Sequence, residues 1–224
     1  MDTALPQKSL IGSVLQAVFP ELCLECGERL AHAGFFCARC GENGSLKRVG
    51  DIEPENGIAR SFAFRYEHTG KTLFGAAKFS ERRRAINFLI GEGRSHLAPL
   101  SGGSTLVLGL PSRRKFLQKL LRSVVPKEKL MPNAFAVRRK LFGKDANKLL
   151  GEGERYKRIH ENLVWAGKSL PEADRYILCD DVSTTGATLN HAAHLLQKHA
   201  AVPKEKITLW ALMYRPRHFL MPRQ

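Results

Sequence analysis

The chain has 224 residues, 43% of them hydrophobic, so it is long enough to bury the core of one main domain and a small appendage. Lys and Arg number 36 against 21 Asp and Glu, and the net charge of +15 predicts a polyanionic partner: nucleic acid, an anionic membrane surface or a phosphorylated substrate. No apolar stretch approaches the roughly 18 residues of a membrane-spanning helix. Residues 9–19 form an amphipathic stretch without the basic start and cleavage site of a signal peptide, so the cytoplasm is the expected compartment.

The first motif along the chain is "CLECGERLAHAGFFCARC", which contains two C-x-x-C pairs separated by ten residues. A glycine follows each pair and lets the backbone turn toward a metal. Four thiolates close a tetrahedral shell around zinc and leave no open position, so the site is expected to be structural. Two disulfides or four free thiols are the alternative. The predicted zinc ligands are Cys23, Cys26, Cys37 and Cys40.

Downstream of the cysteines, strand patterns alternate with helix patterns, which indicates an α/β fold with a mostly parallel sheet and helices on both faces. Residues 41–57 are rich in Gly, Asn, Glu and Asp and are interpreted as a linker. The expected strands are 61–66, 104–110, 133–139, 176–182 and 207–214, and the expected helices are 71–90, 114–124 and the stretch after Gly186.

Basic residues gather in three groups, which predicts a shared electropositive groove rather than three unrelated solvated faces. The first group is Arg82 to Arg84. The second is Arg113, Arg114 and Lys115, directly after the strand at 104–110. The third consists of Arg138, Arg139, Lys140, Lys144, Lys148, Arg155, Lys157 and Arg158.

The stretch "ILCDDVSTTGATL" at 177–189 places two acids and a hydroxyl-rich loop between a buried strand and a helix. Open α/β sheets bind ligands at such a junction, and the free amides of a helix start favour an anion. We expect the amides of residues 184–188 to hold a 5′-phosphate, and Gly186 to allow its close approach. Asp180 and Asp181 are acceptors suited to ribose hydroxyls, directly or through Mg²⁺. An Asp-capped turn without a ligand is the alternative.

The same stretch resembles the phosphoribosyl pyrophosphate (PRPP) signature of type I phosphoribosyltransferases: an apolar strand, two acids, then T-T-G-x-T. With the four-Cys knuckles, the layout is similar to the ComF family, including ComFC and GntX-like proteins. The similarity extends to "AAKF" around Lys78 and to "RYKRIHENLVW" at 155–165. It implies an N-terminal helix and zinc-ribbon-like module over 1–45, and a phosphoribosyltransferase-like domain over 58–224.

The resemblance also implies roles for individual residues. Pyrophosphate is expected near "LPSRRK", where Arg113, Arg114 and Lys115 supply charge in place of the family's R-G-F-N-Q segment. Purine-salvage relatives carry an Asp where this chain has Thr184. The residues implied to bind PRPP or its phosphate are Asp180, Asp181, Ser183, Thr184, Thr185, Gly186, Ala187 and Thr188.

Three functions fit these expectations, and the favoured one is a ComF-like competence protein that retains a PRPP-type binding pocket. By its resemblance to ComF proteins, the chain would act on incoming single-stranded DNA in natural transformation, beside a competence helicase and a DNA-processing protein; its charge would support DNA binding. The second is an active phosphoribosyltransferase that uses Mg²⁺-PRPP and releases pyrophosphate after attack by a nitrogenous acceptor. The third is a PRPP-sensing scaffold without turnover.

Overall fold

The structure is a computed structural model, and it describes residues 20–31, 34–42, 46–112, 115–131, 133–138, 161–167 and 169–215. The amphipathic stretch at 9–19, Arg113 and Arg114 lie outside the described residues, as does the third basic group except Arg138. Within the described ranges, no helix is both long and apolar enough to cross a membrane.

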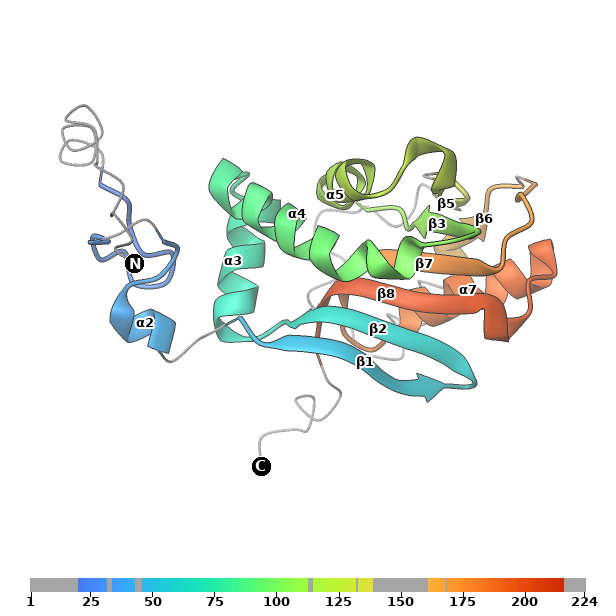
Figure 1. The fold of residues 1–224 in the computed structure, drawn as a ribbon, viewed down its shortest axis with the longest axis horizontal. Helices are drawn as coiled ribbons and strands as arrows, with labels where there is room; N and C mark the ends of the chain where they lie inside the picture. Colours follow the sequence, from blue (N-terminus) through green and yellow to red (C-terminus); the bar gives the residue numbers. More distant parts are fainter. Residues whose placement is uncertain are drawn as a thin grey trace, which may run out of the picture.

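A six-stranded sheet with the strand order β1-β2-β8-β7-β3-β4 forms the centre of the fold (Figure 1). Only β1 is antiparallel to its neighbour, so the predicted mostly parallel α/β sheet is confirmed. β8 is almost wholly apolar and buried, and so is the run Tyr176–Cys179 of β7, as expected of central strands covered on both faces. The strands are β1 (Arg48–Glu55), β2 (Ile58–Arg65), β3 (Thr105–Gly109), β4 (Leu130–Met131), β7 (Arg175–Ser183) and β8 (Ile207–Tyr214).

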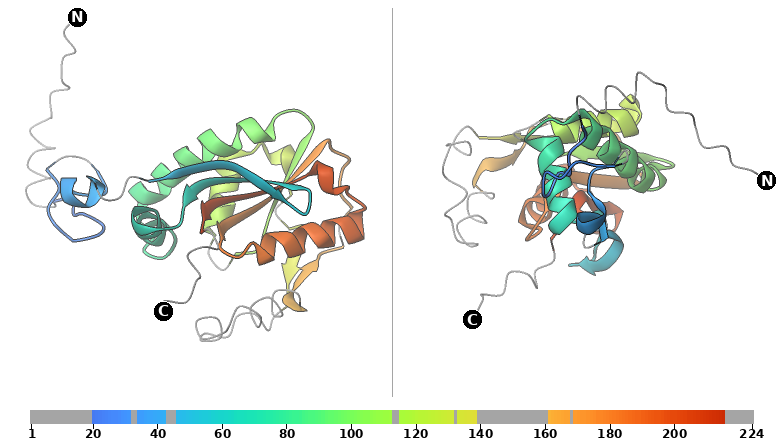
Figure 2. Two further views of the ribbon diagram at one scale, coloured as in Figure 1. Left: turned by 90° about the horizontal axis from the view of Figure 1, so that it is seen from below. Right: turned by 90° about the vertical axis from the view of Figure 1, so that its left-hand side faces the viewer.

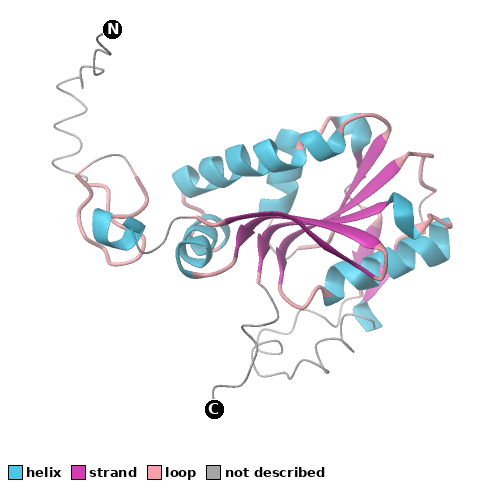
Figure 3. Cartoon of the chain, turned by 60° about the horizontal axis from the view of Figure 1, so that its bottom comes forward, coloured by secondary structure: helices cyan, strands magenta, loops and turns pink. Residues whose placement is uncertain are grey.

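Helices cover both faces of this sheet (Figures 2 and 3). Successive strand residues point to opposite faces, so each strand feeds two separate cores. On β7, for example, Leu178 packs with α7, and Ile177 and Cys179 pack with the helices of the other face. One face carries α3 (His68–Lys78), α4 (Arg83–Leu97) and α5 (Phe116–Val124), and the other carries α7 (Ala187–Ala200).

The sheet topology creates a crevice at the carboxyl ends of β3 and β7. These two strands are parallel neighbours, but β3 leads through α5 to β4 on one side, and β7 leads through α7 to β8 on the other. The connections therefore diverge, and such a switch point is where open α/β sheets bind ligands. The loop predicted to bind phosphate follows β7 at this point.

The interpretation of residues 41–57 as a linker is wrong for most of its length. Residues 48–55 form β1, which pairs with β2 as a hairpin. The turn is Asn56-Gly57, and both residues have positive φ, of 56° and 77°. Asn-Gly is the preferred sequence for this type of tight hairpin turn. The strand was missed because it lies at the sheet edge, where polar side chains are exposed and apolar alternation is weak.

The single helix predicted at 71–90 is in fact two helices, α3 and α4. The break spans residues 79–82, and Glu81 adopts a left-handed backbone conformation with φ of 52°. The apolar periodicity continues across the break because both helices pack on the same face of the sheet. The break ends α3 at Lys78, which places that side chain at the switch point.

A second, two-stranded sheet lies against α7. It consists of β5 (Phe135–Val137) and β6 (Leu163–Trp165), which are antiparallel. The predicted strand at 133–139 is confirmed over its central residues. Phe135 and Trp165 meet edge to face, with ring centroids 5.4 Å apart, and both contribute to the core under α7.

Candidate functional site

The loop between β7 and α7 turns sharply at Gly186. This residue has φ of 76° and ψ of −4°, a left-handed conformation that favours glycine, and its carbonyl accepts the first helical hydrogen bond from Asn190 N–H at 2.9 Å. The Oγ1 of Thr185 accepts from Ala187 N–H at 3.3 Å. The predicted strand, loop and helix start are thus all present, and the first-turn amides of α7 face outward at the helix start.

A cavity of about 250 Å³ opens beside this loop, toward the β1–β2 hairpin. Ser183, Thr184, Thr185 and Gly186 line one wall. The opposite wall comes from β1, β2 and β8, and it consists of Pro54, Glu55, Arg60, Phe62, Leu209 and Tyr214, with Leu189 of α7 closing one side. The cavity therefore combines hydroxyl groups and helix-start amides, which suit a phosphate group, with the Arg60 guanidinium and the Glu55 carboxylate that pairs with it.

Arg60 is a residue of this cavity that sequence reasoning missed. Its guanidinium lies 2.9 Å from Glu55 Oε2, and Glu55 also accepts from the Asn190 side chain at 3.2 Å. This chain of contacts ties the hairpin to the first turn of α7. The alternation in β2 places Arg60 at a partly buried position, but only the fold brings that strand next to the phosphate loop.

The two acids at the end of β7 point to opposite faces of the sheet, as neighbours on a strand must. Asp181 is buried, and its Oδ2 accepts from Lys78 Nζ at 2.6 Å and from Ser112 Oγ at 3.0 Å. This carboxylate therefore joins α3, β7 and the loop after β3. Lys78 was noted for its family resemblance, whereas Ser112 was not singled out at all.

Asp180 is electrostatically distinct from its neighbour. Its Oδ1 accepts from the backbone N–H of Asp181 at 2.7 Å. Desolvation by burial, followed by the negative charge of Asp181, raises the pKa of the Asp180 carboxyl to about 7. A divalent cation or a donor hydroxyl at this carboxylate would oppose that shift.

Lysines gather on the other side of the switch point. A cavity of about 260 Å³ there is lined by Lys78, Lys115 and Lys119, together with Glu81 and apolar residues. Lys115 belongs to the predicted pyrophosphate segment. Lys119 was missed, although its spacing of four residues from Lys115 predicts the same side of a helix. Three ammonium groups face two carboxylates, Glu81 and the Asp181 partner of Lys78, and the remaining positive charge favours an anion at this position.

The four cysteines predicted to bind zinc come together. Their sulfur atoms all lie within 4.8 Å of one another, and the sulfurs of Cys26 and Cys37 are 3.7 Å apart. That separation is too long for a disulfide, but it matches the edge of about 3.8 Å expected for a tetrahedron of sulfurs around zinc. The cluster is therefore consistent with a structural zinc site, and all four cysteines are free rather than paired in disulfides.

The local backbone explains this geometry. Gly27 N–H donates to Cys23 O, and Gly41 N–H donates to Cys37 O, so each pair sits in a tight knuckle. Burial alone would raise the pKa of the Cys23 thiol, but backbone N–H groups, first that of Cys26, lower it to about 6. These amides stabilise the Cys23 thiolate, whereas burial and then the neighbouring cysteines raise the pKa of the Cys40 thiol to about 12.

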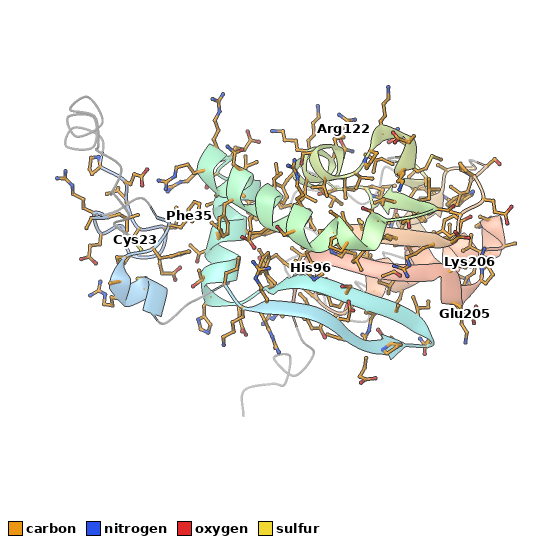
Figure 4. The ribbon with its side chains drawn as sticks, viewed as in Figure 1. Cys23, Phe35, His96, Arg122, Glu205 and Lys206 are labelled. Atoms are coloured by element: carbon orange, nitrogen blue, oxygen red, sulfur yellow. The ribbon has the colours of Figure 1, made fainter. Side chains whose placement is uncertain are left out.

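The four-Cys module is docked on the helices of the main domain. Phe35 meets Phe88 of α4 edge to face, with centroids 5.1 Å apart, and Figure 4 shows Phe35 between the module and the helices. Glu25 accepts a hydrogen bond from Thr72 of α3, and Glu21 pairs with Arg84 of α4. The module thus contacts α3, the helix that ends at Lys78.

Comparisons with known proteins give little beyond this geometry. No family model matches the chain, and no curated protein matches it. Among solved structures it is similar to an adenine phosphoribosyltransferase, at 18% sequence identity and a TM-score of 0.39, over 76% of this chain and 85% of that protein. A similarity at this level carries no argument about activity, so the contacts within the site have to support any function.

Proposed function

We propose that the chain binds a PRPP-type phosphoribosyl ligand at the switch point and transfers the phosphoribosyl group to a nitrogenous acceptor. The observation that carries this proposal is the arrangement of three kinds of group around one junction. A hydroxyl-lined helix start lies beside Arg60, Asp180 lies close to the end of β7 at Ser183, and three lysines gather on the other side. A 5′-phosphate, a ribose diol and a pyrophosphate need these groups in this order.

Each part of the ligand has a proposed partner. The 5′-phosphate would bind the loop formed by Ser183, Thr184, Thr185, Gly186, Ala187 and Thr188. The ribose hydroxyls would bind Asp180, with Mg²⁺ neutralising its charge. Asp181 would act through its contact with Lys78, which holds the ammonium group near the pyrophosphate. Lys115 and Lys119 would complete that anion site.

In the proposed reaction, an acceptor nitrogen attacks C1 of the ribose, and the bond between C1 and the pyrophosphate oxygen breaks. The electron pair leaves with pyrophosphate, and the acceptor nitrogen releases its proton to solvent. The lysines would stabilise the leaving charge by position, without covalent chemistry. With Thr184 in place of an acid, the loop offers no carboxylate to a purine base, so the proposal does not name a purine as acceptor.

Calorimetric titration of Mg²⁺-PRPP into the zinc-loaded chain tests the proposal. Saturable heat is expected, with an affinity at least ten-fold weaker in Asp180→Asn, because a charge-assisted contact is worth about 1.5–3 kcal/mol. Asp174→Asn, an exposed acid just before β7 at the opposite edge of the sheet, is the matched control and should bind like the wild type. Absence of heat in the wild-type chain would refute binding.

The net charge of +15 supports a second proposal, that the protein binds single-stranded DNA in the cytoplasm as a ComF-like competence factor, beside a helicase and a DNA-processing protein. Its affinity for an oligonucleotide should then fall steeply with salt, with one released counterion for each phosphate neutralised. A steep salt slope without PRPP binding would favour this function over the transferase, whereas PRPP binding without DNA affinity would favour the transferase.

A further inference from the structure

A second large cavity lies away from the phosphate loop. It has a volume of about 700 Å³ and opens between the β5–β6 sheet and the far part of α7. Along α7 its lining runs from His191 to His199, about 8–20 Å from Gly186 at 1.5 Å per residue, and it shares no lining residue with the cavity beside the phosphate loop. The cavity is therefore distinct from the switch point. Its lining residues are Arg138, Glu161, Leu163, Val164, Trp165, Gly167, His191, His194, Leu195, Lys198 and His199.

The charges of this cavity favour an anion. Arg138 follows β5 directly, and Lys198 lies one turn beyond His194 on the same side of α7. Among the described residues, neither the Arg138 guanidinium nor the Lys198 ammonium forms an ion pair, and Glu161 is the only carboxylate among the residues that line the cavity. Two permanent cations and neighbouring imidazoles therefore surround a space with one opposing charge.

The cavity also has an apolar wall that includes an aromatic ring. Leu163 and Leu195 are buried, and Trp165 is partly buried, with its ring held edge to face against Phe135. The Nε2 of His191 donates to Leu163 O at 3.1 Å, which fastens β6 to α7. The wall therefore offers a surface that a flat apolar group can contact. The cavity volume of about 700 Å³ also lies within the range of small-ligand pockets, about 300–1,000 Å³.

We propose that this cavity is a binding site for a nucleoside monophosphate. The phosphate would contact Arg138 and Lys198, and the base would pack against Trp165. Inorganic phosphate would use only the cations, and an unphosphorylated nucleoside would use only the apolar wall. The site is separate from the proposed transferase site, and its occupancy does not require that site to function.

Tryptophan fluorescence reports this site almost alone. The chain has two tryptophans, and the other, Trp210, is fully buried and donates its indole N–H to His96 Nδ1 at 3.0 Å. Titration of the zinc-loaded chain with AMP, GMP, CMP and UMP should quench Trp165 saturably with at least one of them. Trp165→Phe should remove the change in signal. Phosphate and unphosphorylated nucleosides should bind at least ten-fold more weakly, because each lacks half of the contacts.

Charge-reversal variants make the test specific. Lys198→Glu is expected to weaken the quenching affinity at least ten-fold, whereas Lys127→Glu, an exposed lysine outside the cavity, should leave it unchanged. Asp180→Asn should also leave it unchanged, which separates this site from the phosphate loop. The proposal is overturned if no nucleotide quenches saturably, if Lys198→Glu binds like the wild type, or if inorganic phosphate binds as tightly as the nucleotide.

Discussion

Replacing Lys78 by Met should destabilise the protein far more than removing both members of its ion pair. Lys78 Nζ lies 2.6 Å from Asp181 Oδ2, and the two side chains are only 15% and 7% exposed. In Lys78→Met, the Asp181 carboxylate stays buried with only the Ser112 hydroxyl as a hydrogen-bonding side chain in the described structure. Breaking one side of a buried pair costs about 3–5 kcal/mol, because the remaining charge has lost its partner.

The double variant Lys78→Met/Asp181→Asn removes both charges and should recover most of that loss. We expect the double variant to lie within about 1.5 kcal/mol of the wild type, so the coupling energy in the cycle is about 2 kcal/mol or more. For a domain of this size, each kcal/mol shifts Tm by about 2–4 °C, so the single variant should lower Tm by about 6–20 °C.

Urea unfolding of the zinc-loaded chain, followed by circular dichroism, measures all four corners of this cycle. Lys71→Met is the matched control, because this lysine is exposed on the same helix and forms no ion pair within the described residues. Additive losses, or a loss below about 1 kcal/mol in Lys78→Met, would show that the pair is too well solvated for this reasoning.

Three further predictions concern the loop, the acid and the metal site. Gly186→Ala should lower the free energy of unfolding in urea by about 1–3 kcal/mol, because φ at this position is 76°. The same variant should weaken Mg²⁺-PRPP binding in calorimetry. Unchanged stability would contradict the left-handed turn. The pKa of Asp180 is about 7 in the folded state, whereas an unfolded Asp loses its proton near pH 4. Between these values the folded state binds more protons than the unfolded state, so the stability of the fold falls as pH rises from about 4 to 7. Asp180→Asn should therefore stabilise the chain at pH 8 more than at pH 4 in urea unfolding, and equal effects would refute the shift. Mass spectrometry under native conditions should find one zinc ion per chain. Cys26→Ser should lose the zinc and lower Tm, because the docking of Phe35 on Phe88 depends on a folded module. A wild-type chain without metal would contradict the site.

The secondary structure followed from the sequence where local patterns were strong. The buried run of β7 and the periodic helix after Gly186 were predicted because each depends on neighbours in the chain. The hairpin of β1 was missed despite its Asn-Gly turn, since an edge strand has no apolar alternation to reveal it. The break between α3 and α4 was missed because both helices bury the same face.

The sequence by itself determined the two compact motifs of the protein, the cysteine knuckles and the loop after β7, because their chemistry lies within a few consecutive residues. Tertiary structure decided which distant groups join them: Lys78 reaches Asp181 across 103 positions, and Arg60 reaches the loop through the order of strands in the sheet. It also decided that the four-Cys module rests on α3 and α4, and that a basic cavity forms under α7. The physical reason is that hydrogen-bonding periodicity is set locally, whereas burial and ion pairing depend on which elements pack together.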